Sequence, residues 1–482
     1  MNADERFSDR KLHEECAVFG ASLKKDTAAG ITYNGLLSLQ HRGQEGAGIA
    51  VCSENKIICH KGLGLVSEVF GNREIRSLPP GRTAIGHNRY STTGNNTAAN
   101  VQPFVTDYLT GRIAVAHNGN IINARFLRKE LFQRGVDFNA SSDSEIISSL
   151  IAYETVRSFL SGRDSVNKTL EGVIEACKKL EGAFSLVILN GKHQLIAVRD
   201  PHGFRPLCIG QNETGTVVAS ESCAVECCGF SFLRDIRPGE VLVIENGEIT
   251  FAQQVLPEKK KGLCVFEYIY FARPDSMIDG LNVAQARRAM GRILAEEAPV
   301  DADAVSPIPD SGWEAALGYA ETSGLPFLSS FVKNRYIGRS FIYPIQEQRE
   351  SAVRLKLNPL RGNVEGKRIV LIDDSIVRGT TCALIIRSLK EAGAKEVHMR
   401  ISSPPFRYTC YFGTDIGDEK NLLANKIDPE KMARAVGADS LKFLSLSGLR
   451  QACRQTRLPL CLGCFTGDYG IPVEKICKED FE

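Results

Sequence analysis

Ile369–Thr381 reads IVLIDDSIVRGTT, and this stretch decides the fold of the second half of the chain. An apolar run leads into two acids, and a turn of the form Ser-x-x-x-Gly-Thr-Thr then opens a helix-forming run. Open α/β sheets bind their ligands where strands end in this way. The backbone N–H groups of such a turn and of the helix start can hold an anion. The stretch therefore predicts an anion site at the edge of a parallel sheet.

The side chains of the turn suit a phosphate group. Ser375, Thr380 and Thr381 add hydroxyl donors to the backbone N–H groups. Gly379 has no side chain, so the backbone can approach the anion closely there. We expect these four residues to surround the phosphate.

The two acids, Asp373 and Asp374, suit ribose hydroxyls with a divalent cation such as Mg²⁺ beside them. The whole string, which includes Val377 and Arg378, resembles the phosphoribosyl pyrophosphate (PRPP) signature of type I phosphoribosyltransferases. The resemblance implies that the acids contact the ribose hydroxyls and that the loop holds the 5-phosphate. It also implies the α/β fold of that family.

Two other segments extend this resemblance. Pro309–Gly312 (PDSG) resembles the family's pyrophosphate loop, which would place Asp310 and Ser311 near pyrophosphate and the metal. In the next segment, basic and aromatic residues around a glycine suit a mobile loop that closes over a polyanion. Its cations are Lys333, Arg335, Arg339, Arg349 and Arg354. We expect the first two of them to bind PRPP.

Composition limits what the rest of the chain can be. The 482 residues suffice for about three domains or two large ones. Lys plus Arg number 59 and Asp plus Glu number 57, and this balance excludes a polybasic nucleic-acid binder. No apolar run approaches the ~18 residues of a membrane span, and the charged start MNADERFSDRKLHEE lacks the apolar core of a secretory signal. We expect a cytoplasmic protein without nucleic-acid or membrane partners.

The pattern of strands and helices changes near the polar connector Glu258–Gly262 (EKKKG). Before it, short β-like runs surround two helical stretches, near Ile121–Arg134 and Ser144–Phe159, which favours a layered α+β domain. After it, apolar strands alternate with helices, which favours a parallel sheet. From about Asn421 we expect helices followed by a loop region with cysteines.

Cys16 follows a fifteen-residue leader and opens an apolar strand. The motifs QHRGQEGAGIA, GHNRYST, AHNGN and SSDSE come after it at intervals. In this order they resemble the class II glutamine amidotransferase domain, which has the N-terminal-nucleophile fold. Removal of Met1–Glu15 would free the α-amino group of Cys16, and an amine with a pKa of ~7.7–8.0 is a suitable base for its own thiol. The thiolate would then attack the amide carbon of glutamine.

The resemblance also implies roles for residues around this cysteine. Asn118 and the Gly119 N–H resemble the family's oxyanion hole, which stabilises the tetrahedral intermediate. Arg89 would hold the glutamine carboxylate in a bidentate fork, and Asp143 would hold the substrate ammonium. In a chain that keeps its leader, the amine is part of a peptide bond, so that form should lack the base.

A glutaminase domain followed by a PRPP-binding domain is similar to the glutamine phosphoribosylpyrophosphate amidotransferase family. The similarity implies a propeptide at 1–15, a glutaminase domain at 16–250 and a phosphoribosyltransferase domain at 262–482. It implies that glutamine and PRPP yield 5-phosphoribosylamine, glutamate and pyrophosphate, the first committed step of purine biosynthesis. It further implies a homo-oligomer, dimer or tetramer, that purine nucleotides inhibit.

Two other functions account for part of the pattern. A PRPP-sensing regulator without catalysis would keep the two acids, but it has no use for a cysteine behind a leader. A glutamine-dependent transferase could instead aminate a different phosphosugar. Product analysis with PRPP and labelled glutamine separates all three functions.

The chain has 15 cysteines, an odd number whose spacing does not suggest a disulfide scaffold. Cys461 and Cys464 form CLGC, and the spacing alone fits a zinc half-site, a redox pair or two buried thiols. Cys264 and Cys410 stand where the family's iron–sulfur branch has its other ligands. The resemblance thus implies a [4Fe–4S] cluster on these four cysteines, with Zn²⁺ as the alternative. Its role would be structural, since neither reaction step moves electrons.

Overall fold

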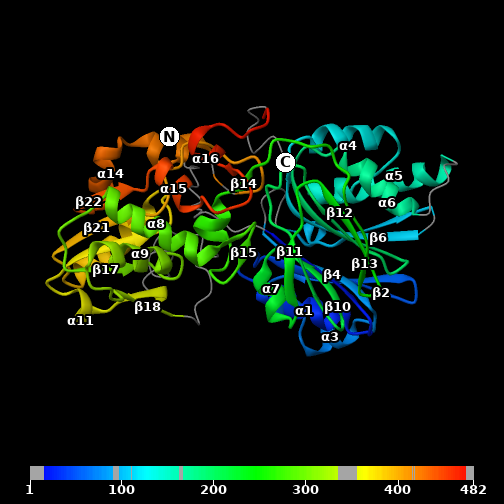
Figure 1. The fold of residues 1–482 in the computed structure, drawn as a ribbon, viewed down its shortest axis with the longest axis horizontal. Coiled ribbons are helices and arrows are strands. Elements are labelled where there is room, and N and C mark those ends of the chain that lie inside the picture. The colour runs from blue at the N-terminus through cyan, green and yellow to red at the C-terminus, as the bar shows by residue number, and fades with distance from the viewer. Residues whose placement is uncertain are drawn as a thin grey trace, which may run out of the picture.

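The computed structural model describes residues 16–90, 97–109, 111–161, 167–334, 355–414, 416 and 418–473. Figure 1 shows two lobes side by side. The first lobe contains the strands up to β13, and the second contains the helices and strands from Leu263 onward. Short pairs of strands, among them β14 and β15, lie where the two lobes meet (Figure 1).

The first lobe contains two antiparallel sheets. The larger sheet has seven strands, and the strand that follows Cys16 lies inside it, next to β4 and β10. Its order is β11 (Ser231–Asp235), β9 (Cys208–Asn212), β10 (Gly215–Ala219), β1 (Ala17–Leu23), β4 (Thr83–Arg89), β2 (Gly46–Ser53) and β3 (Lys56–Leu63). The six strands of the other sheet are, in order, β13 (Glu248–Gln254), β12 (Glu240–Glu245), β8 (Leu195–Arg199), β7 (Gly182–Asn190), β6 (Gly111–Ile121) and β5 (Phe104–Tyr108).

The two sheets pack face to face because each has an apolar inner face. Val18 and Ile85 of one sheet share a buried cluster with Val187 and Leu195 of the other. Helices cover both outer faces, so the lobe has four layers. On the larger sheet lie α1 (Ala28–Ser38), α2 (Val66–Val69), α3 (Asn72–Ser77) and α7 (Ser222–Cys227); on the smaller lie α4 (Ala124–Gln133), α5 (Asp143–Leu160) and α6 (Lys168–Cys177). This layered α+β architecture confirms the expected fold class of the first half.

The expected helices of this lobe are α4 and α5. Helix α5 begins where the motif SSDSE predicts a start, because the Ser142 side chain accepts a hydrogen bond from the Ser144 N–H at 3.2 Å. Asp143 and Glu145 lie in its first turn, where the helix dipole favours negative charge.

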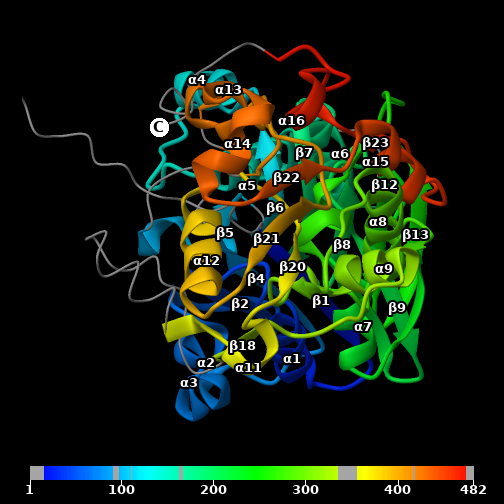
Figure 2. The ribbon, with the colours of Figure 1, turned by 90° about the vertical axis from the view of Figure 1, so that its left-hand side faces the viewer.

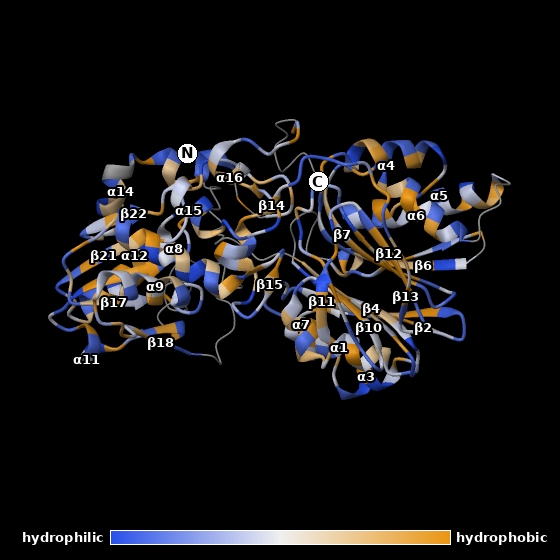
Figure 3. Ribbon diagram, viewed as in Figure 1, coloured by the Kyte–Doolittle hydropathy of each residue, from blue (hydrophilic) through white to orange (hydrophobic). Residues whose placement is uncertain are grey.

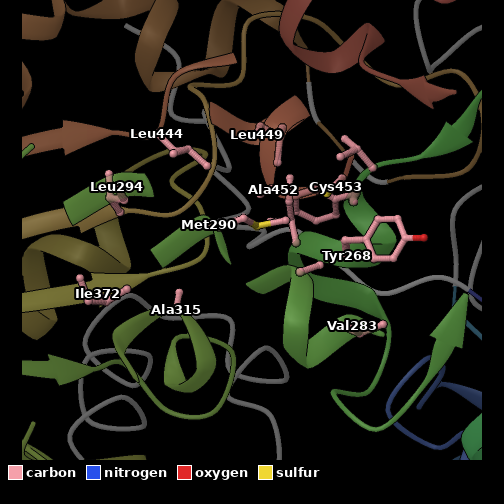
Figure 4. Packing of buried hydrophobic residues seen from close by; sticks show 14 of the residues in the cluster. Tyr268, Val283, Met290, Leu294, Ala315, Ile372, Leu444, Leu449, Ala452 and Cys453 are labelled. Atoms are coloured by element: carbon pink, nitrogen blue, oxygen red, sulfur yellow. The ribbon is translucent and has the colours of Figure 1, made fainter. Parts of the chain in front are cut away.

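The second lobe contains a parallel sheet of four strands: β17 (Ala304–Pro307), β20 (Arg368–Asp373), β21 (Glu396–Ile401) and β22 (Ser440–Phe443). Alternate residues of β20 face opposite sides, so Val370 and Ile372 join one core and Leu371 joins the other. The first core lies against α8 (Val283–Glu297), α9 (Trp313–Ser323) and α15 (Leu446–Ala452) (Figure 4). The second lies against α12 (Thr380–Glu391) and α14 (Pro429–Val436) (Figure 2). Apolar colouring follows the central strands of both lobes (Figure 3).

One expectation about the C-terminal part is wrong. Ser440–Phe443 forms strand β22 at the edge of the parallel sheet, where we expected helices and loops. The strand has only four residues, and it is recognisable only from its partner β21. The remaining short elements of this lobe are β18 (Phe331–Lys333), β19 (Leu357–Pro359), α11 (Arg361–Val364), η4 (Glu419–Asn421), α13 (Leu423–Lys426) and α16 (Gly463–Thr466).

Two pairs of short strands and one helical turn lie where the second lobe meets the first. β14 (Leu263–Cys264) pairs in parallel with β23 (Leu460–Cys461), and β15 (Met277–Ile278) pairs with β16 (Leu281–Asn282). Between them lies a single π-helical turn, η2 (Glu267–Phe271). Arg287 of α8 holds this turn, because its side chain donates to the carbonyls of Tyr268 and Ala272, both at 2.8 Å.

Helices α8 and α9 pack backbone to backbone, which requires glycine at the contact. A Cβ on Gly318 would lie 2.0 Å from the Arg288 carbonyl oxygen. We expect Gly318→Ala to cost about 1–3 kcal/mol of stability or more, since the helices must separate. Gly30 is the control, because it lies in α1 and a Cβ there meets nothing within 4 Å. Gly30→Ala should instead stabilise by about 0.5–1 kcal/mol. Thermal unfolding of both variants checks this, and equal effects of the two substitutions would contradict it.

Candidate functional site

Cys16 directly precedes β1 and lies next to the end of β4. Ala17 is paired with Asn88 in the antiparallel register, which brings Cys16 beside Arg89 and Tyr90. The Cys16 side chain lies 3.4 Å from the Tyr90 carbonyl oxygen, and its sulfur accepts from the Tyr90 N–H at 3.5 Å. Only 8% of the residue is exposed. The thiol is thus held in place at the edge of the larger sheet.

Asn118 and Gly119 lie on β6, in the facing sheet, and β6 is tied to β4 at this point. The His87 ring nitrogen Nε2 lies 3.1 Å from the His117 carbonyl oxygen. The amide nitrogen and oxygen of the Asn118 side chain are both buried, and among the described residues neither has a hydrogen-bond partner. Gly119 has a φ of +142°, and a Cβ there would lie 2.1 Å from the Ala183 carbonyl oxygen. The backbone at this position therefore requires glycine, and the Asn118 amide is available for a ligand.

Arg89 and Asp143 supply opposite charges to the same place. Burial lowers the pKa of Arg89, while the nearby Cys16, Glu45 and Asp143 oppose this shift. The Arg89 guanidinium donates to the Asn100 carbonyl, and Asn100 in turn accepts from the Ser142 N–H at the start of α5. The structure thus gathers the predicted nucleophile, the predicted carboxylate-binding arginine and the predicted ammonium-binding acid.

Asp143 is held in its charged form by its surroundings. Burial would raise its pKa, but His117, the Ile121 N–H and the Ser144 hydroxyl together bring the pKa below its usual value. The Ile121 N–H lies 3.1 Å from one carboxylate oxygen, and the His117 ring lies 3.7 Å from the other. A buried carboxylate that stays charged is suited to hold a cation such as the ammonium group of an amino acid.

The second candidate site lies at the carboxyl end of the parallel sheet. Strand β20 ends at Asp373, the turn follows, and α12 begins at Thr380 after Gly379, whose φ is +84°. Asp374 is only 6% exposed, its N–H donates to the Asp373 side chain at 3.0 Å, and its carboxylate accepts from the Ser375 hydroxyl. This is the strand, glycine turn and helix that the sequence predicts. Val377, Arg378 and Thr381 lie in the same turn and the first turn of the helix.

The PDSG loop meets this turn because β17 runs parallel to β20. Ile308 N–H donates to the Ile372 carbonyl at 2.8 Å, and a Cβ on Gly312 would lie 2.5 Å from that same oxygen. Asp310 of the loop forms an ion pair with Lys333, and Ser311 is the next residue along the loop. The predicted pyrophosphate loop and the predicted ribose site therefore share one edge of the sheet. Arg335 and the other cations up to Arg354 lie outside the described residues, as do Met1–Glu15.

Tyr270, which no sequence motif predicts, lies beside this second site. Burial raises the pKa of Tyr270, and the carboxylates of Asp374, Asp373 and Asp310 raise it further. Tyr270 belongs to η2, about a hundred residues before the signature. No local pattern in the sequence marks it, since the contact arises from the way η2 packs on the sheet.

Arg42, in the motif QHRG, is a second functional residue that the sequence does not single out. The Arg42 side chain is fully buried and donates to the Cys16 carbonyl at 3.3 Å. Its other nitrogens bind two buried carboxylates, those of Glu221 and Glu267. An arginine in a motif rich in glycine and glutamine is the one signal that could have drawn attention to it.

Four cysteines come together where the C-terminal segment returns to the start of the second lobe. Cys264 and Cys461 are neighbours in the β14–β23 pair. Burial raises the pKa of the Cys464 thiol well above its usual value, and the thiols of Cys264, Cys410 and Cys461 raise it further. Burial also raises the pKa of Cys461 to about 12. The four cysteines therefore gather around Cys464 in a partly buried place.

Within the described ranges, no group of three or more His, Cys, Asp or Glu side chains is arranged to hold a metal ion. A single zinc ion requires four sulfurs within ~2.3 Å of one point. A cluster of four irons is larger, so its thiolates stand further apart. Four cysteine thiolates are a ligand set that both groups accept.

Comparison with known proteins identifies the family. Residues 87–226 match the glutamine amidotransferase domain family. An amidophosphoribosyltransferase of Archaeoglobus fulgidus is 47% identical over 93% of this chain and 96% of its own. One of Methanocaldococcus jannaschii is 47% identical over 96% of this chain and 99% of its own. The chain belongs to the amidophosphoribosyltransferase family.

A solved structure agrees with this assignment over both lobes. The glutamine PRPP amidotransferase of Bacillus subtilis, complexed with ADP and GMP, is 42% identical and has a TM-score of 0.86. The match covers 96% of this chain and 99% of that one. The chain is thus a glutamine-dependent amidophosphoribosyltransferase, which makes 5-phosphoribosylamine for purine biosynthesis. Among the described residues, no helix is both long and apolar enough to cross a membrane.

Proposed function

We propose that residues 16–250 release ammonia from glutamine at Cys16 and that residues 262–482 add it to PRPP at the edge of the parallel sheet. The observation that carries this division of labour is the setting of Asn118. Its buried amide lacks a partner among the described residues, and it lies on the strand tied to the end of β4, where Cys16 and Arg89 are found. An unsatisfied buried amide is costly unless a ligand satisfies it.

In the first step the free α-amino group of Cys16 takes the proton of its thiol, and the thiolate attacks the amide carbon of glutamine. Asn118 and the Gly119 N–H stabilise the negative oxygen of the intermediate. The carbon–nitrogen bond breaks, the amine returns the proton to the leaving nitrogen, and ammonia departs. Water then hydrolyses the thioester to glutamate. Arg89 and Asp143 bind the carboxylate and the ammonium of the substrate, since they supply the matching charges beside the nucleophile.

In the second step ammonia attacks C1 of PRPP with inversion, the bond from C1 to the pyrophosphate oxygen breaks, and the nitrogen loses one proton. Asp373 and Asp374 hold the ribose hydroxyls. The pyrophosphate is bound by Lys333 and Arg335 together with the loop of Asp310. The 5-phosphate lies in the turn with Ser375, Val377, Arg378, Gly379, Thr380 and Thr381.

Mg²⁺ binds in proteins through one or two carboxylates together with substrate phosphates, so a complete cage of protein ligands is not needed. Ser311, Asp373 and Asp374 offer such oxygens at the edge of the sheet. When bound with PRPP, the ion neutralises the charge that develops on the departing pyrophosphate.

We propose a [4Fe–4S] cluster at the start of the second lobe. Its ligands would be Cys264, Cys410, Cys461 and Cys464. The gathering of the other three cysteines around Cys464 supports this proposal. The cluster would join β14, the segment after β21 and the C-terminal segment covalently. The B. subtilis relative was complexed with ADP and GMP, so we also propose that purine nucleotides bind and inhibit this chain. We further propose that the chain forms a homo-oligomer.

Separate variants distinguish the two sites. We expect Cys16→Ala to abolish glutamine-dependent synthesis and to leave ammonia-dependent synthesis intact, because PRPP binds in the other lobe. Asp373→Asn or Asp374→Asn should impair both. Cys177→Ala, a buried thiol of α6, is the control and should keep both activities. Loss of both activities in a folded Cys16→Ala protein would contradict the two-site scheme, and product analysis with labelled glutamine decides the matter.

The proposed base requires a free amine on Cys16. Mass spectrometry of active protein should show that Met1–Glu15 has been removed. A variant that cannot be processed should have little glutaminase activity, since its nitrogen is an amide. Full glutamine use by a chain that still carries the leader would overturn the proposal.

The cluster makes a prediction that does not depend on activity. Protein purified without oxygen should be brown and should contain about four irons per chain. Cys264→Ser should lose the iron and unfold at a lower temperature. Cys453→Ala removes another buried thiol of the same core and should keep the iron. Colourless protein with stoichiometric zinc would decide for the alternative.

A further inference from the structure

Arg42 is a buried cation that touches the proposed nucleophile through the backbone. Its Nε donates to the Cys16 carbonyl at 3.3 Å. Its Nη1 donates to Glu221 and to Glu267, and its Nη2 donates to Glu267, all at 2.8 Å. The three side chains are fully buried. A guanidinium held on three sides in this way has one position, and that position fixes the carbonyl of Cys16.

The two carboxylates come from different lobes. Glu221 precedes α7 of the first lobe and is also held by the Arg273 N–H at 2.9 Å and by the Ser276 hydroxyl at 2.6 Å. Glu267 begins η2, and the residues after it belong to the core of the second lobe. The Nη atoms of Arg42 donate three hydrogen bonds to these carboxylates. Glu267 accepts two of them, and Glu221 accepts the third.

We propose that Glu267 is a positioning residue for glutamine hydrolysis: a carboxylate of the synthase lobe orients Cys16 of the glutaminase lobe through Arg42. The inference rests on the proposed role of Cys16 as the nucleophile. It adds that the glutaminase site is incomplete within residues 16–250, because one of its supports lies at residue 267.

The reason lies in the geometry that the nucleophile needs. The amine and the thiol of Cys16 must both face the substrate, and Arg42 holds the carbonyl of this residue, which sets the rotation of the whole residue. Displacement of a reacting group by about 1 Å lowers catalysis by about 100-fold. Without Glu267, Arg42 loses two of its three hydrogen bonds to these carboxylates, and the guanidinium can turn about Glu221.

The experiment compares two substitutions of Glu267 in the full, processed enzyme. In Glu267→Gln the new amide presents an N–H to an N–H of Arg42, so one charged hydrogen bond is lost and the negative charge with it. Glu267→Asp keeps the charge on a shorter side chain. Asp279→Asn is the control, because Asp279 also forms a buried ion pair between the lobes, but its partner is Arg199, at 2.7 Å, and not Arg42.

Three quantities are measured: glutamine hydrolysis, ammonia-dependent synthesis, and the alkylation of Cys16 by iodoacetamide against pH, read from the mass of the Cys16 peptide. For Glu267→Gln we expect kcat for glutamine to fall about 10- to 100-fold. KM should change little, since Arg89 and Asp143 stay in place. The pH profile of Cys16 alkylation should shift, because the amine no longer faces the thiol. Glu267→Asp should recover part of the loss.

Ammonia-dependent synthesis shows that the variants are folded. The proposal is wrong if glutamine-dependent and ammonia-dependent rates fall together, if Asp279→Asn has the same effect on kcat as Glu267→Gln, or if the alkylation profile does not move. If alkylation of Cys16 in the unsubstituted enzyme leaves glutamine use intact, the proposed role of Cys16 fails instead. The two failures are therefore distinguishable.

Discussion

Three buried arginines hold the two lobes together, and the rest of the structure depends on them. Arg42, Arg199 and Arg205 are the largest fully buried side chains of the described residues, and each comes from the first lobe. Arg42 binds Glu267, Arg199 binds Asp279, and Arg205 donates to the Phe412 carbonyl, all partners in the second lobe. A buried charge is costly unless its partners are complete, and removal of one partner typically costs about 3–5 kcal/mol. The lobes therefore have one relative position in which these charges are satisfied.

That fixed position explains how one short element can serve two reaction sites. The π-helical turn η2 begins with Glu267 at the Arg42 side and carries Tyr270 beside the acids of the proposed PRPP site. Both ends of the turn are braced by Arg287 of α8. Ammonia released in water would be protonated and would no longer act as a nucleophile. A rigid junction that brings the two proposed sites to a single turn of helix would shorten the path of ammonia between them.

The sequence predicts those parts of the structure that local rules determine. The strand, glycine turn and helix around Asp373 follow from apolar periodicity and turn chemistry, and the start of α5 follows from its capping serine. The candidate residues Cys16, Arg89 and Asp143 were found because each lies in a recognisable motif. Strand β22 was missed because four residues of edge strand depend on their neighbour rather than on their own pattern. Glu267 and Tyr270 were missed because their roles exist only when the two lobes are packed.

The position of Cys410 suggests why an enzyme that moves no electrons would hold four thiols. The segment after Cys410 lies directly against the proposed oxyanion hole: the Asn120 side chain donates to the Tyr411 carbonyl at 2.8 Å, and a Cβ on Gly413 would lie 3.3 Å from the Gly119 carbonyl carbon. Cys264 lies three residues before Glu267, at the other support of the glutaminase site. The two segments that contact the proposed glutaminase site thus each begin at a cysteine that we propose as a cluster ligand. A group that joins these cysteines would fix the two segments against each other, and its structural role would be felt at the first reaction site rather than at the PRPP site.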